Sequence, residues 1–335
     1  MHDTFARVAV IGAGTWGTTL ASLVAHNAPT VLWARRTELV DEMRRTHRNS
    51  VYLSGIELHP ELTFSHNFAD TLTDADAVIV AVPSGGFRDV TRLMSSYVGA
   101  GVPLVSVTKG LERGTGRRMS EVLAEILPER PVAALSGPNL AREIAEGQPA
   151  ASVVACANDD VARRLQSLFA RPAFRVYTNE DLVGCEIGGV VKNVLAIATG
   201  IAHGMGFGDN TRATLITRGL AEMSRLGVAL GADALTFSGL AGVGDVVATC
   251  SSLQSRNTSV GVLLGKGSSL SEAIASTGQM VAEGVRSAAA IVALGRKVAV
   301  EMPICEAVAD VCDSRVAASE AMIRLMTRAH KSERN

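Results

Sequence analysis

Hydrophobic and polar positions follow two alternating patterns along the first half of the chain. Short, continuous apolar runs, such as VAVI at 8–11 and AVIV at 77–80, are typical of strands that are buried on both faces. Between these runs, apolar residues recur every three or four positions, which is the pattern of a helix packed against a core. This alternation predicts an α/β fold with a doubly wound, mostly parallel sheet that helices cover on both sides.

The pattern changes near residue 180, after which no further strand is expected. We predict an irregular segment over 50–67 and strands within 6–14, 29–36, 74–84, 102–110, 131–139, 151–157 and 174–179. Later periodicity predicts helices at 181–204, 210–230, 243–250, 256–265, 271–276, 282–296, 302–312 and 317–328. The chain is therefore expected to form two domains, an α/β domain over 1–180 and an all-α domain over 181–330.

Composition and charge narrow the classes of protein to consider. The formal net charge of −1 gives no indication of nucleic-acid binding or of attraction to an anionic membrane. We expect no export signal and no membrane insertion, since the longest apolar stretch contains Glu186 and Lys192. The five cysteines form no CxxC pair and the seven histidines form no ligand pair at helical spacing. We therefore expect reduced thiols, no metal site and a cytoplasmic location.

A glycine motif follows the first predicted strand. The sequence VAVIGAGTWG places Gly12, Gly14 and Gly17 in GxGxxG spacing, where a strand ends and a helix begins. The first glycine permits a tight turn, the second lets the backbone approach a pyrophosphate, and the third lets helix and strand pack closely. The free N–H groups of the helix start favour an anion. The motif therefore predicts a dinucleotide-binding, Rossmann-like domain.

The end of the second strand bears on which dinucleotide binds. An acidic residue there would accept a hydrogen bond from the ribose 2′-hydroxyl of NAD, but this chain has Arg35 and Arg36 in WARR. Arginine pairs well with the 2′-phosphate of NADP. We therefore expect NADP(H), with NAD(H) as the alternative, although two solvated surface arginines would give the same sequence.

Further candidates stand at the ends of other strands, where ligands bind in open parallel sheets. Lys109 in SVTKG can reach a bound anion, or it is an ordinary loop lysine. Gly137 and Asn139 in LSGPN follow another strand, and Asn139 could also be the N-cap of the next helix. Pro83 and Ser84 in AVPS could form the floor of the cofactor site.

Lys192 lies in GCEIGGVVKNVLAI, a stretch apolar enough to form a buried helix. A charged amine without a partner is costly in such a place. Burial favours the neutral form of a lysine, and a lysine near neutrality can exchange a proton with a substrate oxygen. The oxidation of an alcohol needs such a group, so we predict that Lys192 is a general acid and base. A lysine that reaches water at the helix edge is the alternative.

A second group of polar residues suits an anionic substrate. Asp245 follows two glycines in GLAGVGDVVATC, and Ser255, Arg256 and Asn257 open a later helix in QSRN. An arginine with neighbouring donors at a helix start is suited to phosphate. Asp245 could hold Lys192 in its charged form or accept a hydrogen bond from a substrate hydroxyl. Ordinary helix caps would also explain Asp245 and the SRN sequence.

Together these motifs resemble the NAD(P)-dependent glycerol-3-phosphate dehydrogenases of the bacterial type, along almost the whole chain. The matching segments are VIGAGTWGTTLA, VLWARR, AVPS, TKGLE, SGPN, GGVVKNVLAIATG, RGLAEMSRLG, GLAGVGDVVATC, QSRN, EGVRS and EMPI. The resemblance implies reversible conversion of dihydroxyacetone phosphate into glycerol 3-phosphate, which supplies the backbone of glycerophospholipids. It implies a small phosphate ester as the substrate, and we expect a homodimer.

The resemblance also implies roles for single positions, with Lys192 as the proton acceptor. Implied substrate contacts are Lys109, Gly137, Asn139, Lys192, Asp245, Ser255, Arg256 and Asn257. Implied cofactor contacts are Gly12, Gly14, Thr15, Trp16, Gly17, Arg35, Arg36, Lys109, Ala141, Arg256, Val281 and Glu283. The sequence VAEG stands where many members have VVEG, so the chain departs from the family at the cofactor edge near residue 282.

Two other functions fit part of these observations. A related two-domain β-hydroxyacid dehydrogenase would share the glycine turn and Lys192, but the SRN sequence favours a phosphate ester over a plain carboxylate. A protein that senses NADP(H) without chemistry would keep the fold and would have no need of Lys192.

Overall fold

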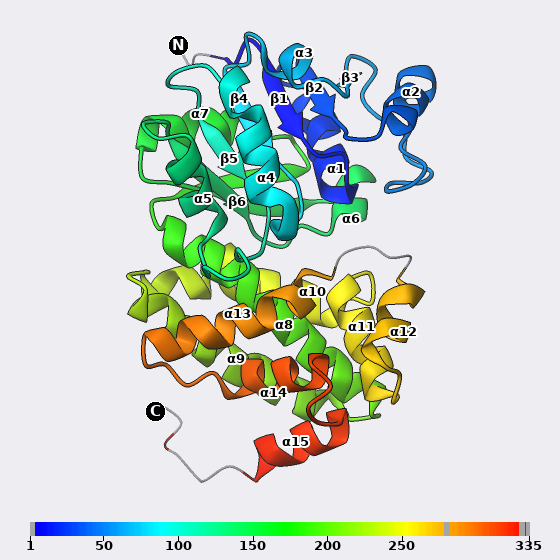
Figure 1. Ribbon diagram of the computed structural model, residues 1–335, viewed down its shortest axis with the longest axis vertical. Helices are drawn as coiled ribbons and strands as arrows, with labels where there is room; N and C mark the ends of the chain where they lie inside the picture. Colours follow the sequence, from blue (N-terminus) through cyan, green and yellow to red (C-terminus); the bar gives the residue numbers. More distant parts are fainter. Residues whose placement is uncertain (1–3, 278–281, 328–331, 333–335) are drawn as a thin grey trace.

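A computed structural model describes residues 4–277, 282–327 and 332 of the chain. An α/β part packs on an all-helical part, and the two are joined directly after the last strand (Figure 1). The predicted fold class, a mostly parallel sheet with helices followed by helices alone, is confirmed.

The sheet of the described residues has eight strands in the order β3-β2-β1-β4-β5-β6-β7-β8. Strand β1 pairs in parallel with both β2 and β4, so the strand order reverses beside β1. Strands β6 and β7 are antiparallel, and the other neighbouring pairs are parallel. The strands are β1 (Val8–Ile11), β2 (Thr30–Trp33), β3 (Thr63–Ser65), β4 (Ala77–Val80), β5 (Leu104–Ser106), β6 (Val132–Ser136), β7 (Ala150–Cys156) and β8 (Phe174–Asn179).

Both faces of the sheet are buried. Val8 and Val10 of β1 pack into one hydrophobic cluster, whereas Ala9 and Ile11 pack into the other. This alternation of faces explains why the strands read as continuous apolar runs. The first cluster is covered by α1 (Thr15–Val24), α2 (Thr37–Thr46), α6 (Ala141–Ala145) and α7 (Asp159–Phe169), and the second by α3 (Phe68–Leu72), α4 (Ser84–Met94) and α5 (Met119–Ile126).

One expectation for this part is wrong. The segment 50–67 is not irregular throughout, because Thr63–Ser65 forms the edge strand β3 beside β2. This strand has three residues, and only its central Phe64 is a large apolar residue, so no alternation marks it in the sequence. The five-residue helix α3 that follows was also not expected.

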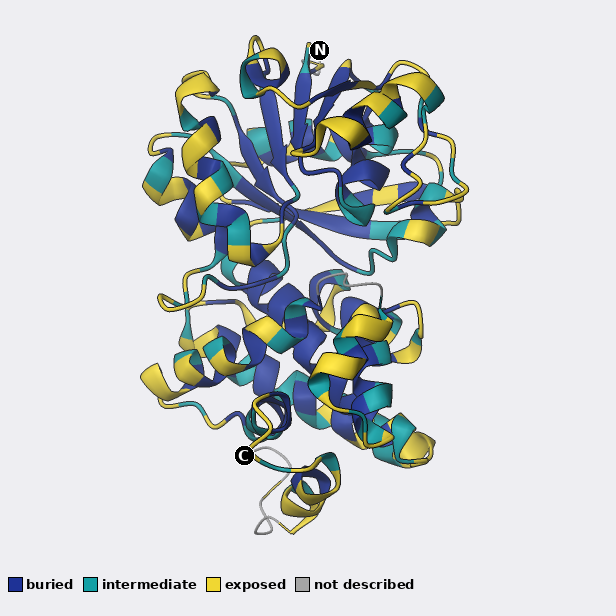
Figure 2. Cartoon of the chain, turned by 45° about the vertical axis from the view of Figure 1, so that its right-hand side comes forward, coloured by how far each residue is buried: buried dark blue, intermediate teal, exposed yellow. Residues whose placement is uncertain are grey.

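The helical part is arranged around α8 (Leu182–Gly204), whose residues 184–202 are all buried (Figure 2). The predicted helices are confirmed over most of their lengths: α9 (Asp209–Ala229), α10 (Asp245–Ser251), α11 (Arg256–Gly265), α12 (Leu270–Ser276), α13 (Glu283–Lys297), α14 (Pro303–Cys312) and α15 (Ala318–Met326). Short 3-10 and π-helical turns over 234–238 and 240–244 precede α10 and were not expected.

Helix α8 is long and apolar enough to cross a membrane, but 89% of its most apolar stretch is buried inside the protein. Its packing against the other helices thus accounts for its composition. Glycines bring α8 and α11 into backbone contact: a Cβ atom added at Gly200 would lie 2.3 Å from the carbonyl oxygen of Thr258. A Cβ added at Gly261 would lie 2.3 Å from the carbonyl oxygen of Ile197. This close approach sets α11 along the C-terminal half of α8, which follows Lys192.

Candidate active site

The glycine turn has the geometry that a pyrophosphate site needs. Gly12 has a φ of +115°, which side chains rarely adopt, and a Cβ at Gly17 would lie 2.0 Å from the carbonyl oxygen of Gly12. Gly14 is the N-cap of α1 and offers no side chain to the free N–H groups of the helix start. A Cβ at Gly14 would meet no atom within 4 Å, so the space in front of the helix is open. The turn therefore fits the phosphates of a dinucleotide.

Other predicted cofactor residues surround this turn. Thr15 is the first residue of α1, and the indole N–H of Trp16 is buried without a hydrogen-bond partner. Arg35 and Arg36 are exposed just beyond β2, and the Arg36 guanidinium lies 5.5 Å from the centre of the Tyr52 ring. Because β2 neighbours β1, the two arginines stand at the sheet edge that also carries the glycine turn.

Lys192 is buried and has specific partners. Its ammonium group donates a hydrogen bond to the hydroxyl of Thr249 at 2.7 Å and lies 3.1 Å from Oδ1 of Asp245. The Thr249 hydroxyl in turn donates to the same Asp245 oxygen at 3.1 Å. Lys192 is only 8% exposed, so the alternative of a lysine that reaches bulk water at the helix edge is wrong.

Lys109 joins the same cluster from the other part of the chain. It follows β5, and its ammonium group lies 2.5 Å from Oδ2 of Asp245 and donates to the carbonyl oxygen of Gly137 at 2.7 Å. Burial lowers the pKa of Lys109 to about 8, and the nearby charge of Lys192 adds to this effect, although Asp245 opposes it. The simple reading of Lys109 as a loop lysine in water is therefore wrong.

Asp245 connects the two lysines and does not act as the N-cap of α10, which is Gly244. Burial alone would raise the pKa of this carboxyl group, but the charges of Lys109 and Lys192 and their hydrogen bonds outweigh burial and hold it below its usual value. With one carboxylate and two ammonium groups, the cluster has a formal charge of +1 when all three are ionised. Such a cluster attracts an anion.

A chain of side-chain amides lies next to this cluster and was not predicted. Asn193 donates to the backbone carbonyl of Lys109 at 3.1 Å and accepts from the Asn257 amide at 3.0 Å. Asn257 then accepts a hydrogen bond from the backbone N–H of Gly284 at 3.0 Å. Asn193 directly follows Lys192, and a buried amide in so apolar a helix needs such partners. A polar amide next to Lys192 in an apolar helix was therefore the feature of the sequence that could have indicated a role for Asn193.

The remaining substrate candidates lie at the start of α11. Ser255 is the N-cap and accepts from the N–H of Thr258, as the helix-cap reading of SRN expected. Arg256 is the first residue of α11 and its side chain is exposed. Since Asn257 is bonded to Asn193, this helix start stands close to the lysine cluster.

At the end of β6, Asn139 donates to the hydroxyl of Ser152 at 3.2 Å, and its carbonyl oxygen is buried without a partner. The N-cap of α6 is Leu140, so the expectation that Asn139 caps this helix is wrong. Ala141 begins α6, and its carbonyl oxygen accepts from the Thr19 hydroxyl of α1 at 3.3 Å. Asn139 therefore keeps a free acceptor in the region of Gly137.

Glu283 links the helical part of the protein to the α/β part. It begins α13 and accepts hydrogen bonds from the hydroxyl of Ser84 at 2.5 Å and from its backbone N–H at 3.1 Å. Ser84 begins α4, directly after Pro83 at the end of the β4 segment. Val281, another predicted cofactor residue, lies outside the described residues.

Two family models match the chain. The model described as NAD-dependent glycerol-3-phosphate dehydrogenase N-terminus matches residues 7–162, and the model of the C-terminus matches residues 181–323. The NAD(P)+ glycerol-3-phosphate dehydrogenases of Corynebacterium jeikeium and Thermobifida fusca are 51% and 52% identical in sequence to this chain. Each alignment covers 98% of this chain and 99% or 98% of the relative.

Solved structures agree with these matches. The glycerol-3-phosphate dehydrogenase of Coxiella burnetii is 37% identical, with a TM-score of 0.93 over 96% of this chain and 99% of that one. A ketopantoate reductase from Ralstonia eutropha has a TM-score of 0.60 and 15% identity over 94% and 99% of the two chains, so it shares the fold alone. The chain belongs to the NAD-dependent glycerol-3-phosphate dehydrogenase family of oxidoreductases.

Proposed function

We propose that this chain interconverts dihydroxyacetone phosphate and sn-glycerol 3-phosphate by reversible hydride transfer with NAD(P)H, and that Lys192 is its general acid and base. The observation that carries this proposal is the buried pair of ammonium groups, Lys109 and Lys192, on the two oxygens of Asp245. Two cations at one buried carboxylate suit a small anionic substrate with a carbonyl group to protonate.

The partners of Lys192 fix where its proton can go. An ammonium group has three N–H donors, and Thr249 and Asp245 engage two of them. The third is left for the substrate. In reduction, Lys192 donates its proton to the oxygen that becomes the new hydroxyl, and in oxidation the neutral amine accepts that proton. Lys109 is similarly left with one N–H, because Gly137 and Asp245 take the others.

The phosphate of the substrate is assigned to the start of α11. Arg256 offers a guanidinium there, beside the N–H groups of the first helical turn. Asn257 is oriented by Asn193 and Gly284 and keeps one amide N–H for the substrate. Ser255, Gly137 and Asn139 complete the proposed substrate contacts.

The residues of the glycine turn fit the cofactor, and Gly12, Gly14, Thr15, Trp16 and Gly17 would hold its pyrophosphate. When bound, the nicotinamide supplies or accepts the hydride. The proposed contacts further include Lys109, Ala141, Arg256 and Glu283. NADP(H) is favoured over NAD(H), since Arg35 and Arg36 are exposed where an acidic residue would select NAD.

We further propose that the enzyme acts in the cytoplasm as a homodimer and supplies glycerol 3-phosphate for glycerophospholipid synthesis, without nucleic-acid partners or membrane insertion. The net charge of −1 argues against nucleic-acid partners, and the burial of α8 argues against membrane insertion.

An assay of nicotinamide oxidation tests the proposal. NADPH and NADH are each supplied with dihydroxyacetone phosphate, with a 2-keto carboxylate such as ketopantoate, or with no acceptor. We expect oxidation with dihydroxyacetone phosphate alone, and faster oxidation of NADPH than of NADH. Turnover of the carboxylate and none of the phosphate ester would instead identify a β-hydroxyacid type of dehydrogenase. Cofactor binding without any turnover would identify a sensor.

A further inference from the structure

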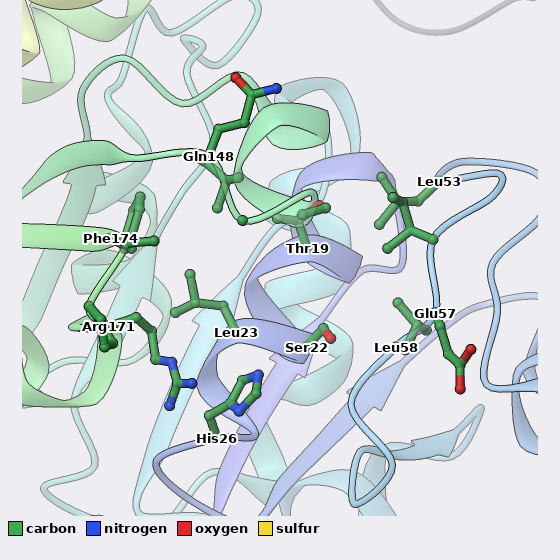
Figure 3. Close-up of a pocket in the computed structure, with 16 residues that line it drawn as sticks. Thr19, Ser22, Leu23, His26, Leu53, Glu57, Leu58, Gln148, Arg171 and Phe174 are labelled. Carbon is green, nitrogen blue, oxygen red and sulfur yellow. The ribbon is translucent and has the colours of Figure 1, made fainter.

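The α/β part contains a pocket that the proposed reaction does not use. It has a volume of about 310 Å³ and lies along the flank of α1, between the segment 53–58, the end of α6 and the turn at 171–174 (Figure 3). This volume is at the lower end of the range for small-molecule sites, about 300–1,000 Å³. None of its lining residues belongs to the proposed substrate or cofactor contacts.

Most of the pocket wall is apolar. The apolar lining residues are Leu23 of α1, Leu53, Ile56 and Leu58 of the opposite segment, and Ile144 of α6. Figure 3 shows Leu23 on the side of α1 toward Phe174, with Leu53 and Leu58 on its other side. Leu53, Leu58 and Ile144 are buried, so the wall continues the hydrophobic cluster on this face of the sheet. A ligand in contact with these side chains needs an apolar body.

One end of the pocket is cationic. Arg171 directs its guanidinium toward His26 (Figure 3), and no carboxylate pairs with Arg171 among the described residues. Glu57, the acidic residue of the lining, already pairs with Arg48 at 3.0 Å. Partial burial lowers the pKa of His26, and the charge of Arg171 and the nearby His59 lower it further, which disfavours a second cation beside Arg171. The pocket therefore presents a single uncompensated positive charge.

We propose that this pocket binds a small amphipathic carboxylate, such as a medium-chain fatty acid, with its carboxylate on Arg171 and its alkyl chain along Leu23, Leu53 and Ile56. Arginine presents a planar fork of N–H groups that matches a carboxylate. The single charge of the guanidinium balances the charge of a monoanionic carboxylate. It would neutralise only half of the charge of a dianionic phosphate. The apolar wall excludes small hydrophilic anions.

Binding of decanoate to the full-length protein, measured by calorimetry with saturating NADPH present, tests the proposal. We expect one saturable site, at least tenfold weaker binding of decanol, and no tighter binding of decyl phosphate. Arg171→Gln should weaken the binding of decanoate at least tenfold. The matched control is Arg175→Gln, which removes a guanidinium that contacts Tyr177 outside the pocket. Ala145→Phe, which fills the pocket, should abolish binding while the melting temperature and the turnover stay close to wild type.

Several results would overturn the proposal. The first is the absence of saturable decanoate binding to the wild type with NADPH present, including binding that is seen only when NADPH is omitted, which would place decanoate in the cofactor site. The second is equal affinity of the wild type and Arg171→Gln. Tenfold tighter binding of decyl phosphate would contradict the carboxylate class. A melting-temperature loss in Arg171→Gln does not obscure the result, because Ala145→Phe and the ligand series test the same site in folded protein.

Discussion

The ammonium group of Lys192 lies 3.1 Å from one carboxylate oxygen of Asp245, and both residues are buried. The other oxygen of the same carboxylate holds Lys109 at 2.5 Å. These three residues come from α8, from the start of α10 and from the segment after β5. One buried carboxylate thus joins the helical part to the segment after β5 and pairs with two ammonium groups, which leaves one positive charge for an anion.

Removal of that carboxylate should cost stability as well as activity. Asp245→Asn leaves two ammonium groups without a counter-ion in a buried place, and breaking a buried pair costs about 3–5 kcal/mol. Urea denaturation should show a loss of this size. The control is Asp209→Asn, which breaks the exposed pair with Arg212 and should cost less than about 1 kcal/mol. Equal stability of the two variants would show that Asp245 is not the buried counter-ion.

Lys192→Ala should remove most of the turnover while NADPH still binds. General acid–base groups contribute roughly 10²–10⁴-fold to the rate, so kcat should decrease by a factor in that range. Fluorescence titration should give a dissociation constant for NADPH within a few-fold of wild type. Lys266→Ala, at an exposed lysine just after α11, is the control and should leave kcat unchanged. Turnover of Lys192→Ala within a few-fold of wild type would disprove the proposed role.

Lys109 should set an alkaline limit on substrate affinity. Its folded-state pKa of about 8 lies below the ordinary 10.5, so its ammonium form, which attracts the substrate, is lost as the pH rises through 8. The KM for dihydroxyacetone phosphate should therefore increase about tenfold per pH unit above 8. Lys109→Arg keeps its charge throughout this range and should not show the increase. If KM increased equally with pH in the wild type and in Lys109→Arg, the increase would belong to another titrating group.

Local patterns predict the sheet and the glycine turn because their causes are local. Burial on both faces imposes continuous apolar runs, and close approach to a phosphate or to another backbone imposes glycine. Strand β3 was missed because Phe64 is its one large apolar residue, so no apolar run marks it in the sequence. Helix α8 was predicted because its apolar run is too long for a strand, and α13 and α14 because apolar residues recur along one face.

The partners within the active site could not be predicted in this way. Lys109 and Asp245 are 136 positions apart, and Asn193 and Asn257 are 64 apart. Their contacts depend on how α8, α10 and α11 pack in three dimensions, which no local pattern encodes. The sequence shows that Lys192 needs a partner, and Asp245 was one candidate. The structure supplies the geometry, and it shows that Asn193 links the lysine cluster to the start of α11.

Arg35→Asp should shift the preference from NADPH toward NADH. A carboxylate at this position repels the 2′-phosphate of NADP and can accept from the 2′-hydroxyl of NAD. The ratio of kcat/KM for NADPH to that for NADH should fall by at least tenfold. Arg44→Asp, which changes the charge by the same amount near the end of α2, is the control. An unchanged ratio in Arg35→Asp would leave Arg35 as ordinary surface charge.

Glu222 should make stability depend on pH. This buried carboxyl of α9 accepts hydrogen bonds from the N–H groups of Ile304 and Cys305 at the start of α14, and burial raises its pKa from 4.5 to about 7. Between these values the folded state binds the extra proton, so the free energy of unfolding should fall as the pH rises from 4.5 to 7, by on the order of 3 kcal/mol. Glu222→Gln does not titrate, so urea denaturation of this variant should show a smaller fall over the same range. Parallel curves for the two proteins would mean that Glu222 keeps an ordinary pKa.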